Sequence, residues 1–274
     1  VESLTMCTAE PIYDPNGILY SPRNQGAGAA NVYKAVNSPV YLTSLQKATG
    51  ELTPKASLGD DPLRTGVFNF SFDMNNLGAT AQTYLLAGML MTDQVEVLDG
   101  KEYMSETGRN LTGKVSFEVL NTQLYTQYDM NRDGRTDMGD VQFMLDVFTG
   151  KATTEADLDV NADGKTNTMD AQGLYLMLLD GFEAQTVVTV PGKGSVTVNV
   201  TIELSEEDMA YMEAHYKNGI YVDGFVRAYA QDESAVDLSL PFVGFYGDWT
   251  DAPVFDTGWY YEDTQTVEYN RYLH

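Results

Sequence analysis

Two segments of this chain repeat one arrangement of oxygen-bearing side chains around a glycine. The segments span residues 129–140 and 159–170, and each places Asp or Asn at positions 1, 3, 5, 9 and 12 and Gly at position 6. Ca²⁺ takes about six to eight oxygen ligands, and this spacing wraps a short loop around one ion. We therefore predict two bound calcium ions. The predicted ligands are Asp129, Asn131, Asp133, Asp137, Asp140, Asp159, Asn161, Asp163, Asn167 and Asp170, with the backbone carbonyls of Arg135 and Lys165.

The same spacing of apolar residues follows each loop. After the first loop these residues are Val141, Met144, Leu145 and Phe148, and after the second they are Ala171, Leu174, Tyr175 and Leu178. Apolar residues at i, i+3, i+4 and i+7 form one stripe of a helix. The chain thus contains a repeated loop-and-helix unit. Removing calcium would leave clustered oxygens repelling one another, so we expect metal binding to be coupled to folding.

This pair of loops resembles a dockerin module over residues 123–182. Position 12 is Asp in both loops, where EF-hands usually carry Glu, and no clear amphipathic helix enters the first loop. The resemblance implies a cohesin module as partner, contacted through loop positions 10 and 11. These positions are Met138, Gly139, Thr168 and Met169. The two faces differ, which argues against a symmetric dual binding mode. The alternative is that calcium only braces the module.

Outside this module the pattern changes to the period of two that is typical of strands. Residues 66–72, 83–90, 114–120, 186–190, 195–202, 219–230 and 237–246 are the predicted strands. Ser205, three residues before Asp208, predicts the start of one helix by a variant of the capping box, and Asn218-Gly219 predicts its end. Neither half has enough strands for a sandwich, so we predict one mainly β sandwich with the module inserted in a surface loop.

Further stretches in two parts of the chain resemble lactocepin-type cell-envelope subtilases. Residues 189–202 and the run Leu-Pro-Phe-Val-Gly-Phe-Tyr-Gly-Asp-Trp at 240–249 resemble their fibronectin type III-like domain. Residues 4–9, 20–28 and 32–36 resemble the last part of their catalytic domain. The predicted organisation is a catalytic-domain tail at 1–50, a split sandwich at 51–122 and 183–250, the module at 123–182, and an extension or the start of a further domain at 251–274.

The net charge, the lack of a long apolar run and the small number of histidines argue against nucleic-acid binding, a membrane-spanning helix and a catalytic triad within this sequence. The net charge of −24 disfavours nucleic acid, and no apolar run approaches the ~20 residues that span a bilayer. Cys7 is expected in the core. His215 and His274 are the two histidines, and we expect His215 near Tyr211 and Tyr216. No nucleophile motif accompanies them, so any Ser-His-Asp triad would lie before Val1.

Two function classes follow. The first is a non-catalytic segment of a secreted or cell-wall-attached subtilisin-like serine endopeptidase that acts on proteins or peptides. The second is a scaffold-bound, cellulosome-like adhesion or structural component unrelated to proteolysis. A glycoside hydrolase rests only on the company that dockerins keep. Tyr20, Trp249, Trp259, Tyr260 and Tyr261 are a candidate aromatic surface, although such residues are more often core or hairpin pairs.

Overall fold

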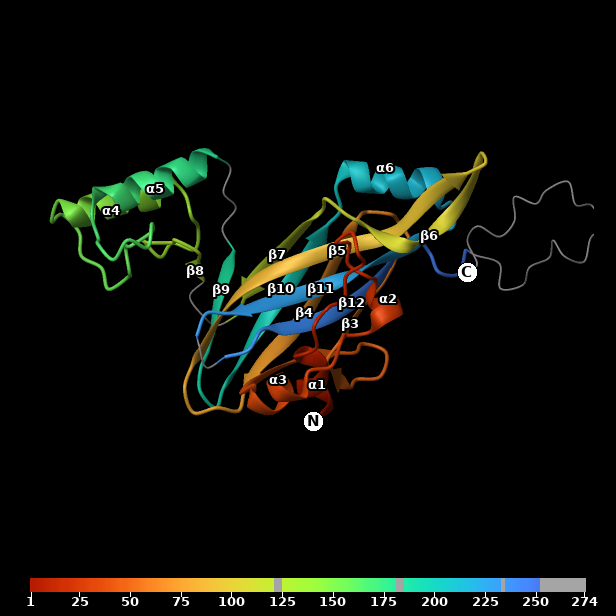
Figure 1. Ribbon diagram of the computed structural model, residues 1–274, viewed down its shortest axis with the longest axis horizontal. Coiled ribbons are helices and arrows are strands. Elements are labelled where there is room, and N and C mark those ends of the chain that lie inside the picture. Colours follow the sequence, from red (N-terminus) through yellow and green to blue (C-terminus); the bar gives the residue numbers. More distant parts are fainter. Residues whose placement is uncertain (121–124, 181–184, 233–234, 252–274) are drawn as a thin grey trace, which may run out of the picture.

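The computed structural model describes residues 1–120, 125–180, 185–232 and 235–251. The described chain is mainly β, as the sequence predicts. Figure 1 shows the β-strands at the centre, the short helices of the N-terminal segment along one side, a helix on the opposite side, and a helical module standing apart at one end. No described helix has the length and apolar content needed to cross a membrane.

The smaller sheet has five strands among the described residues, in the order β2–β1–β4–β10–β7, and all its neighbours are antiparallel. Alternating Val and Phe side chains give β4 and β10 one buried face, since successive side chains of a strand point to opposite sides. The strands are β1 (Val40–Leu45), β2 (Leu52–Thr53), β4 (Val67–Asn76), β7 (Lys114–Val119) and β10 (Ser195–Glu203).

The larger sheet has seven strands among the described residues, in the order β3–β12–β11–β5–β9–β8, with β6 paired to β5. β3 is parallel to β12, and the other pairs are antiparallel. The strands are β3 (Ala56–Asp61), β5 (Gln82–Leu98), β6 (Lys101–Asn110), β8 (Tyr125–Thr126), β9 (Thr186–Val190), β11 (Ile220–Ala230) and β12 (Leu238–Tyr246).

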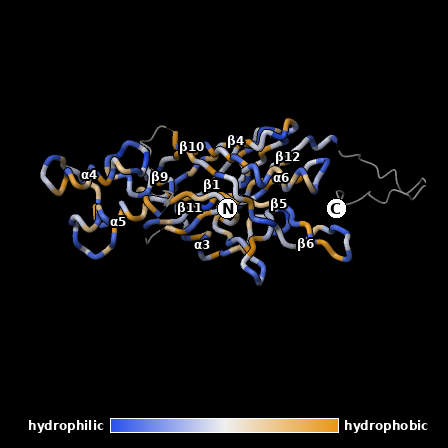
Figure 2. Tube along the Cα trace, turned by 90° about the horizontal axis from the view of Figure 1, so that it is seen from above, coloured by the Kyte–Doolittle hydropathy of each residue, from blue (hydrophilic) through white to orange (hydrophobic). Residues whose placement is uncertain are grey.

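One hydrophobic core joins the two sheets. It contains Phe72 of β4 and Val198 of β10 from the smaller sheet together with Val226 of β11 and Phe242 of β12 from the larger. Figure 2 shows hydrophobic segments running through this two-sheet body. Burial of apolar area at about 25 cal/mol per Å² is the main force that holds such layers together.

Strands from before and after the module alternate within both sheets. Phe72 pairs with Val198, and Gly88 pairs with Val226. Residues 54–120 and 186–246 therefore share their hydrogen-bonded ladders. The boundary predicted between residues 50 and 51 falls after β1, so this part of the predicted catalytic-domain tail is a strand of the smaller sheet.

Four helices lie against the sheets. α1 (Glu2–Cys7), α2 (Pro22–Gln25) and α3 (Val32–Asn37) belong to the N-terminal segment, and α6 (Glu206–His215) lies near β5 and β6 (Figure 1). The capping box at Ser205 and Asp208 that starts α6 is confirmed. The predicted end of this helix at Asn218-Gly219 is wrong, because α6 stops at His215 with Tyr216 as its C-cap.

The module contains α4 (Met138–Phe148) and α5 (Thr168–Leu179), which pack against each other. Its core is separate from that of the sheets and includes Met144 and Leu174, both fully buried. Of the predicted apolar stripe, Val141 and Met144 are buried whereas Leu145 is exposed. Both helices therefore leave apolar side chains at the surface of the module.

Candidate metal-binding module

The first loop is shaped by side-chain oxygens that accept hydrogen bonds from its own backbone. Asp129 accepts from the N–H groups of Asp133 and Gly134 at 3.1 and 2.9 Å. Asn131 accepts from the Asp133 N–H at 2.9 Å, and Asp133 accepts from the Arg135 N–H at 3.0 Å. Asx side chains favour such turns. Gly134 has φ of 91°, a conformation that a side chain would strain.

Position 12 closes the loop from the helix side. The fully buried Asp140 accepts through Oδ1 from the N–H groups of Met130 and Asn131 at 2.7 and 3.1 Å, and through Oδ2 from that of Asp137 at 2.8 Å. The last bond belongs to a capping box that starts α4. A carboxylate oxygen has about two acceptor positions. In this geometry Oδ1 accepts two hydrogen bonds and Oδ2 accepts one.

The second loop repeats these hydrogen bonds to the backbone. Asp159 accepts from the N–H groups of Asp163 and Gly164 at 3.1 and 2.8 Å. Asp170 is fully buried, accepts from the Asn167 N–H at 2.8 Å, and completes the capping box of α5. The turn bonds also recur at the remaining predicted positions, Asn161, Asp163 and Lys165. The predicted ligands thus occupy equivalent places in two equivalent loops.

The predicted side-chain ligands are all oxygen atoms, which are the ligands that calcium prefers. Burial has the largest effect on the pKa of Asp129 and raises it; the Gly134 N–H opposes the rise and the negative charge of Asp140 adds to it. Across the described ranges, however, no three His, Cys, Asp or Glu side chains are gathered into a metal-holding group. Calcium binding stays a prediction.

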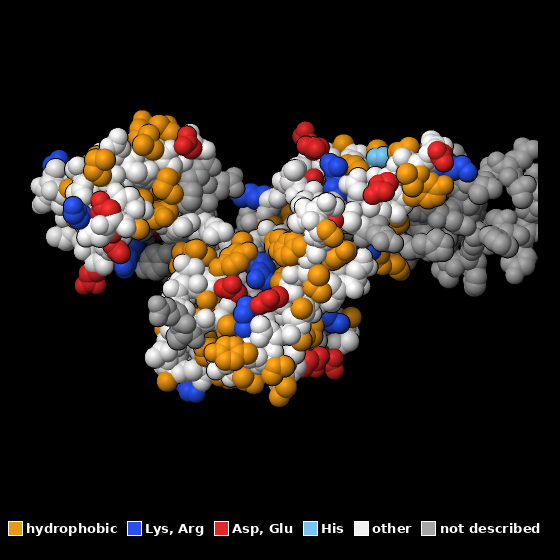
Figure 3. Space-filling view, in the orientation of Figure 1, with side chains coloured by type: hydrophobic (Ala, Val, Ile, Leu, Met, Phe, Trp, Pro, Cys, Tyr) orange, Lys and Arg blue, Asp and Glu red, His pale blue; other side chains and the backbone are white. Residues whose placement is uncertain are grey.

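The predicted partner-contact positions lie at the starts of α4 and α5. Met138, Gly139, Thr168 and Met169 are all exposed. α5 carries two further exposed leucines, Leu176 and Leu179. Figure 3 shows hydrophobic side chains on the surface of the module.

Thr136, at loop position 8, has a role that the sequence does not reveal. Its hydroxyl donates to the carbonyl oxygen of Gln127 at 2.5 Å and lies 2.5 Å from the hydroxyl of Thr126, which belongs to β8. Thr136 thereby joins the first loop to the edge strand of the larger sheet. Among the described residues, Thr166 has no equivalent bond.

A second polar cluster, also absent from the predictions, joins the N-terminal segment to the larger sheet. Arg23 donates to Asp93 and to Asp223, each at 2.7 Å, and the hydroxyl of Ser21 also donates to Asp223. Asp223 is completely buried, and this burial raises its pKa, whereas the charge of Arg23 lowers it. The cluster fixes α2 on β5 and β11.

His215 and Cys7, which the sequence analysis singled out, both pack among other residues of the fold. His215 contacts the rings of Tyr211 and Tyr216, as predicted, and its Nδ1 is 3.5 Å from Glu102. Cys7 is fully buried, which confirms the core position expected for it.

The aromatic residues of the candidate surface differ in their exposure to solvent. Trp249 is 55% exposed and lies against Tyr221 and Phe245, while Tyr20 is half-buried. The predictions for Trp259, Tyr260, Tyr261 and His274 fall outside the described residues.

Comparison with known proteins finds that this chain is similar to proteases of the bacterial cell envelope. No family model matches. The C5a peptidase of Streptococcus pyogenes serotype M1 is 29% identical over 263 residues, covering 93% of this chain and 15% of the relative. That of serotype M3 strain MGAS315 is 30% identical over 263 residues, covering 93% and 16%. The PII-type proteinase of Lactococcus lactis subsp. cremoris is 26% identical over 120 residues, covering 40% and 6%.

These relatives are subtilisin-like proteases of the cell envelope, and the chain is homologous to a segment of them at low identity. The chain spans only 15–16% of the length of the C5a peptidases. A family 123 glycoside hydrolase from Clostridium perfringens aligns over 76% of this chain and 27% of its own, at 7% identity and a TM-score of 0.31. A score this low carries no argument.

Proposed function

We propose that this chain is a non-catalytic accessory segment of a secreted or cell-wall-attached subtilisin-like serine endopeptidase, whose substrates are proteins or peptides. Two calcium ions fold its dockerin-like module, which docks on a cohesin. In this proposal the two sheets form a fibronectin type III-like sandwich. The alignment with the C5a peptidases carries the proposal, because it covers 93% of the chain.

The N-terminal segment supports a contact with a catalytic domain. Val32, Tyr33 and Val36 of α3 are each more than 70% exposed. Exposed apolar side chains grouped on one short helix favour burial against another protein surface. The segment also resembles the end of a subtilase catalytic domain, so we assign this face to that domain.

The repeated loops support calcium binding. Each gathers acidic and amide oxygens on one turn and ties them to a buried position-12 carboxylate, Asp140 or Asp170. In each loop the residues that present oxygens also cap the following helix. A cation held by these oxygens would therefore stabilise both the loop and the start of α4 or α5.

Calorimetric titration of the chelated protein with calcium tests this part. We expect two sites, with dissociation constants on the order of micromolar or weaker, and a melting transition of the module that chelation lowers. Asp129→Ala with Asp159→Ala should abolish both effects. The exposed Asp180→Ala, which lies outside both loops, is the matched control. Absence of calcium heat in the unaltered protein would refute calcium binding.

The exposed apolar side chains favour α5 as the docking face. Met169, Leu176 and Leu179 are 57%, 50% and 64% exposed and lie at a helical spacing of seven and three residues. Their counterparts 30 residues earlier in the first repeat are Gly139, Asp146 and Thr149, which are small or polar. α4 also exposes Met138 and Leu145, so the module presents two apolar faces that are not equivalent.

Binding to a panel of cohesin modules tests the docking face. Exchanging the α5 residues for their counterparts, as Leu176→Asp with Leu179→Thr, should reduce affinity at least about 100-fold, since buried apolar anchors dominate interfaces. The control is Gln142→Asp, which adds the same charge on α4. Loss of binding in the control alone would move the face to α4. If no cohesin binds at all, the module only braces the chain.

The gene that encodes this chain separates the proposal from the scaffold-bound alternative. A subtilase catalytic domain encoded in the same reading frame before residue 1 is expected. A reading frame without Asp, His and Ser motifs of that family would favour an adhesion or structural component.

A further inference from the structure

We propose that the first loop of the module, and not the second, is the latch that holds the module against the edge of the larger sheet. This inference rests on the proposed function in one respect: if the first loop binds calcium, loading that loop also fixes the orientation of the module. The second loop then stabilises the module without affecting its position on the sheet.

The latch begins where the chain enters the first loop. β8 pairs with β9 through Thr126 and Thr186, and the Gln127 N–H donates to the carbonyl oxygen of Gln185 at 2.9 Å. The segment that enters the module is thus bonded to the segment that leaves it. The next residue, Tyr128, has φ of 63°, a left-handed conformation that is rare outside glycine. The chain bends sharply between the sheet edge and the loop.

The first loop reaches back to this joint through Thr136. The Thr126 hydroxyl donates to the Thr136 hydroxyl, which in turn donates to the Gln127 carbonyl oxygen, so the three groups form one hydrogen-bonded chain. The Asp129 N–H also donates to the Thr126 carbonyl oxygen at 3.1 Å. Positions 1 and 8 of the first loop are therefore both attached to β8.

The second loop has no such attachment. Its entry is within the module, where the Asp159 N–H donates to the carboxylate of Asp157 at 3.0 Å. Thr166, the counterpart of Thr136, is exposed and makes no side-chain hydrogen bond within the described part of the chain. Two loops of equal internal geometry thus differ in their link to the sheet.

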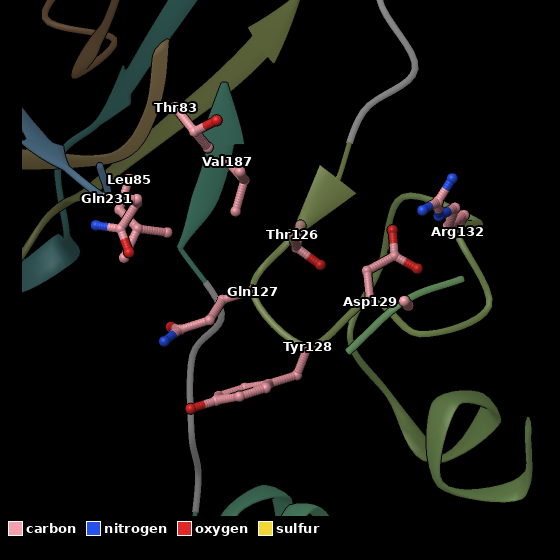
Figure 4. Close-up of a pocket in the computed structure, with 10 residues that line it drawn as sticks. Thr83, Leu85, Thr126, Gln127, Tyr128, Asp129, Arg132, Val187 and Gln231 are labelled. Atoms are coloured by element: carbon pink, nitrogen blue, oxygen red, sulfur yellow. The ribbon is translucent and has the colours of Figure 1, made fainter. Parts of the chain in front are cut away.

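A cavity separates the module from the sheet beside the latch (Figure 4). Its volume is about 520 Å³. The sheet contributes Thr83, Leu85, Thr126 and Val187, and Gln231 follows β11 directly. The module contributes Gln127, Tyr128, Asp129, Arg132 and Ala156. The hydrophobic cores on either side are separate. With no shared core across the joint, a few hydrogen bonds determine its geometry, and the latch bonds are among them.

Threonine-to-valine replacements in the full chain test the latch, because valine keeps the shape and removes the hydroxyl. Thr136→Val should speed hydrogen exchange of the Gln127 amide by about tenfold, the effect of losing one hydrogen bond, and Thr166→Val should leave it unchanged. Thr126→Val lies outside the loop and should match Thr136→Val. Equal exchange in all three variants, or a larger effect from Thr166→Val, overturns the latch.

Spin labels at Gln142→Cys on α4 and Ser195→Cys on β10 report the orientation, since both positions are exposed and Cys7 is buried. In calcium, Asp129→Ala should broaden the distance distribution between the labels, whereas Asp159→Ala should not. Equal broadening by both variants overturns the coupling to calcium. If the unaltered protein binds no calcium, the proposed metal sites fail, and the valine series still decides the latch.

Discussion

The guanidinium of Arg23 donates to the carboxylate of Asp223 at 2.7 Å, and this carboxylate is completely buried in β11. The pair joins two residues that lie 200 positions apart. Arg23 also stacks on the ring of Tyr221, with its guanidinium carbon 4.3 Å from the ring centre. The N-terminal segment is thereby attached to the larger sheet by charge as well as by packing.

Replacing Arg23 with Met should destabilise the protein by about 3 kcal/mol at neutral pH. The substitution keeps an apolar stem but leaves the charge of Asp223 buried without its partner. Chemical denaturation of Arg23→Met against Lys47→Met, an exposed lysine, measures the loss. Adding Asp223→Asn to Arg23→Met should recover part of the stability, because the unpaired charge is then gone. A double variant that is less stable than Arg23→Met alone would contradict this account.

The loss in Arg23→Met should also depend on pH. Burial raises the pKa of Asp223 above its ordinary value of 3.8, and Arg23 limits that rise. A raised folded-state pKa means that the folded protein binds the proton more tightly, so stability falls as pH increases from 3.8 to the folded pKa and is constant above it. Without Arg23 the folded-state pKa of Asp223 rises further, so the pH range over which stability falls extends to higher pH. The deficit relative to the unaltered protein should be smaller at about pH 5 than at about pH 7.

Cys7 should be inert toward thiol reagents in the folded protein. Its Sγ donates to the carbonyl oxygen of Leu42 at 3.3 Å, and burial raises its pKa to about 12. The thiolate is the reactive form, and at about pH 8 almost none is present. A colorimetric thiol assay should show slow labelling in buffer and rapid labelling in denaturant. Complete labelling of the native protein within the mixing time would show that α1 opens readily.

Gly173→Ala should stabilise the module by about 0.5–1 kcal/mol. The glycine lies inside α5, and an added Cβ would meet only Val160, at 4.0 Å. The contrasting variant is Gly224→Ala on β11, whose Cβ would collide with the carbonyl oxygen of Met89 on β5. Scanning calorimetry should show a higher melting transition for the module in the first variant and a lower one for the sheets in the second. A destabilising Gly173→Ala would mean that α5 is not packed as described.

Asp208→Ala should cost about 2–3 kcal/mol, more than an ordinary helix cap. The buried carboxylate of Asp208 accepts from the N–H of Ser205 at 3.2 Å and from that of Thr112 at 3.0 Å, so it ties the start of α6 to the loop before β7. Glu206→Ala, in the same helical turn but exposed, is the control and should have little effect. Equal losses in the two variants would show that helix charge, and not these bonds, determines the stability.

The sequence predicts those elements whose burial follows a simple period. β4 and β10 alternate clearly because each has one face in the core, and both loops of the module could be predicted because Asp and Asn bond locally to nearby N–H groups. β6 was missed because its sequence is polar and its pairing depends on the hairpin with β5. β1 was missed because it lies in a segment that resembles another domain.

Long-range polar contacts could not be predicted from local pattern. Thr136 resembles Thr166 in its loop, yet only Thr136 has β8 beside it among the described residues, and that placement depends on pairing with β9. Arg23 and Asp223 look like ordinary charged residues until the fold brings them together. Such contacts arise from topology, which a single sequence does not encode in its spacing.

Phe72 of β4 pairs with Val198 of β10, which lies far later in the sequence. During synthesis from the N-terminus, β4 therefore cannot pair with β10 until the chain between them has been made. Until β10 and β11 follow, β4 and β5 each lack the partner on one edge, and that edge stays open to other chains. The module needs only contacts among its own residues, and its completion brings β8 and β9 together. A folded insertion shortens the loop that the sheets must close. Folding of the module thus favours pairing between the strands that precede it and the strands that follow it.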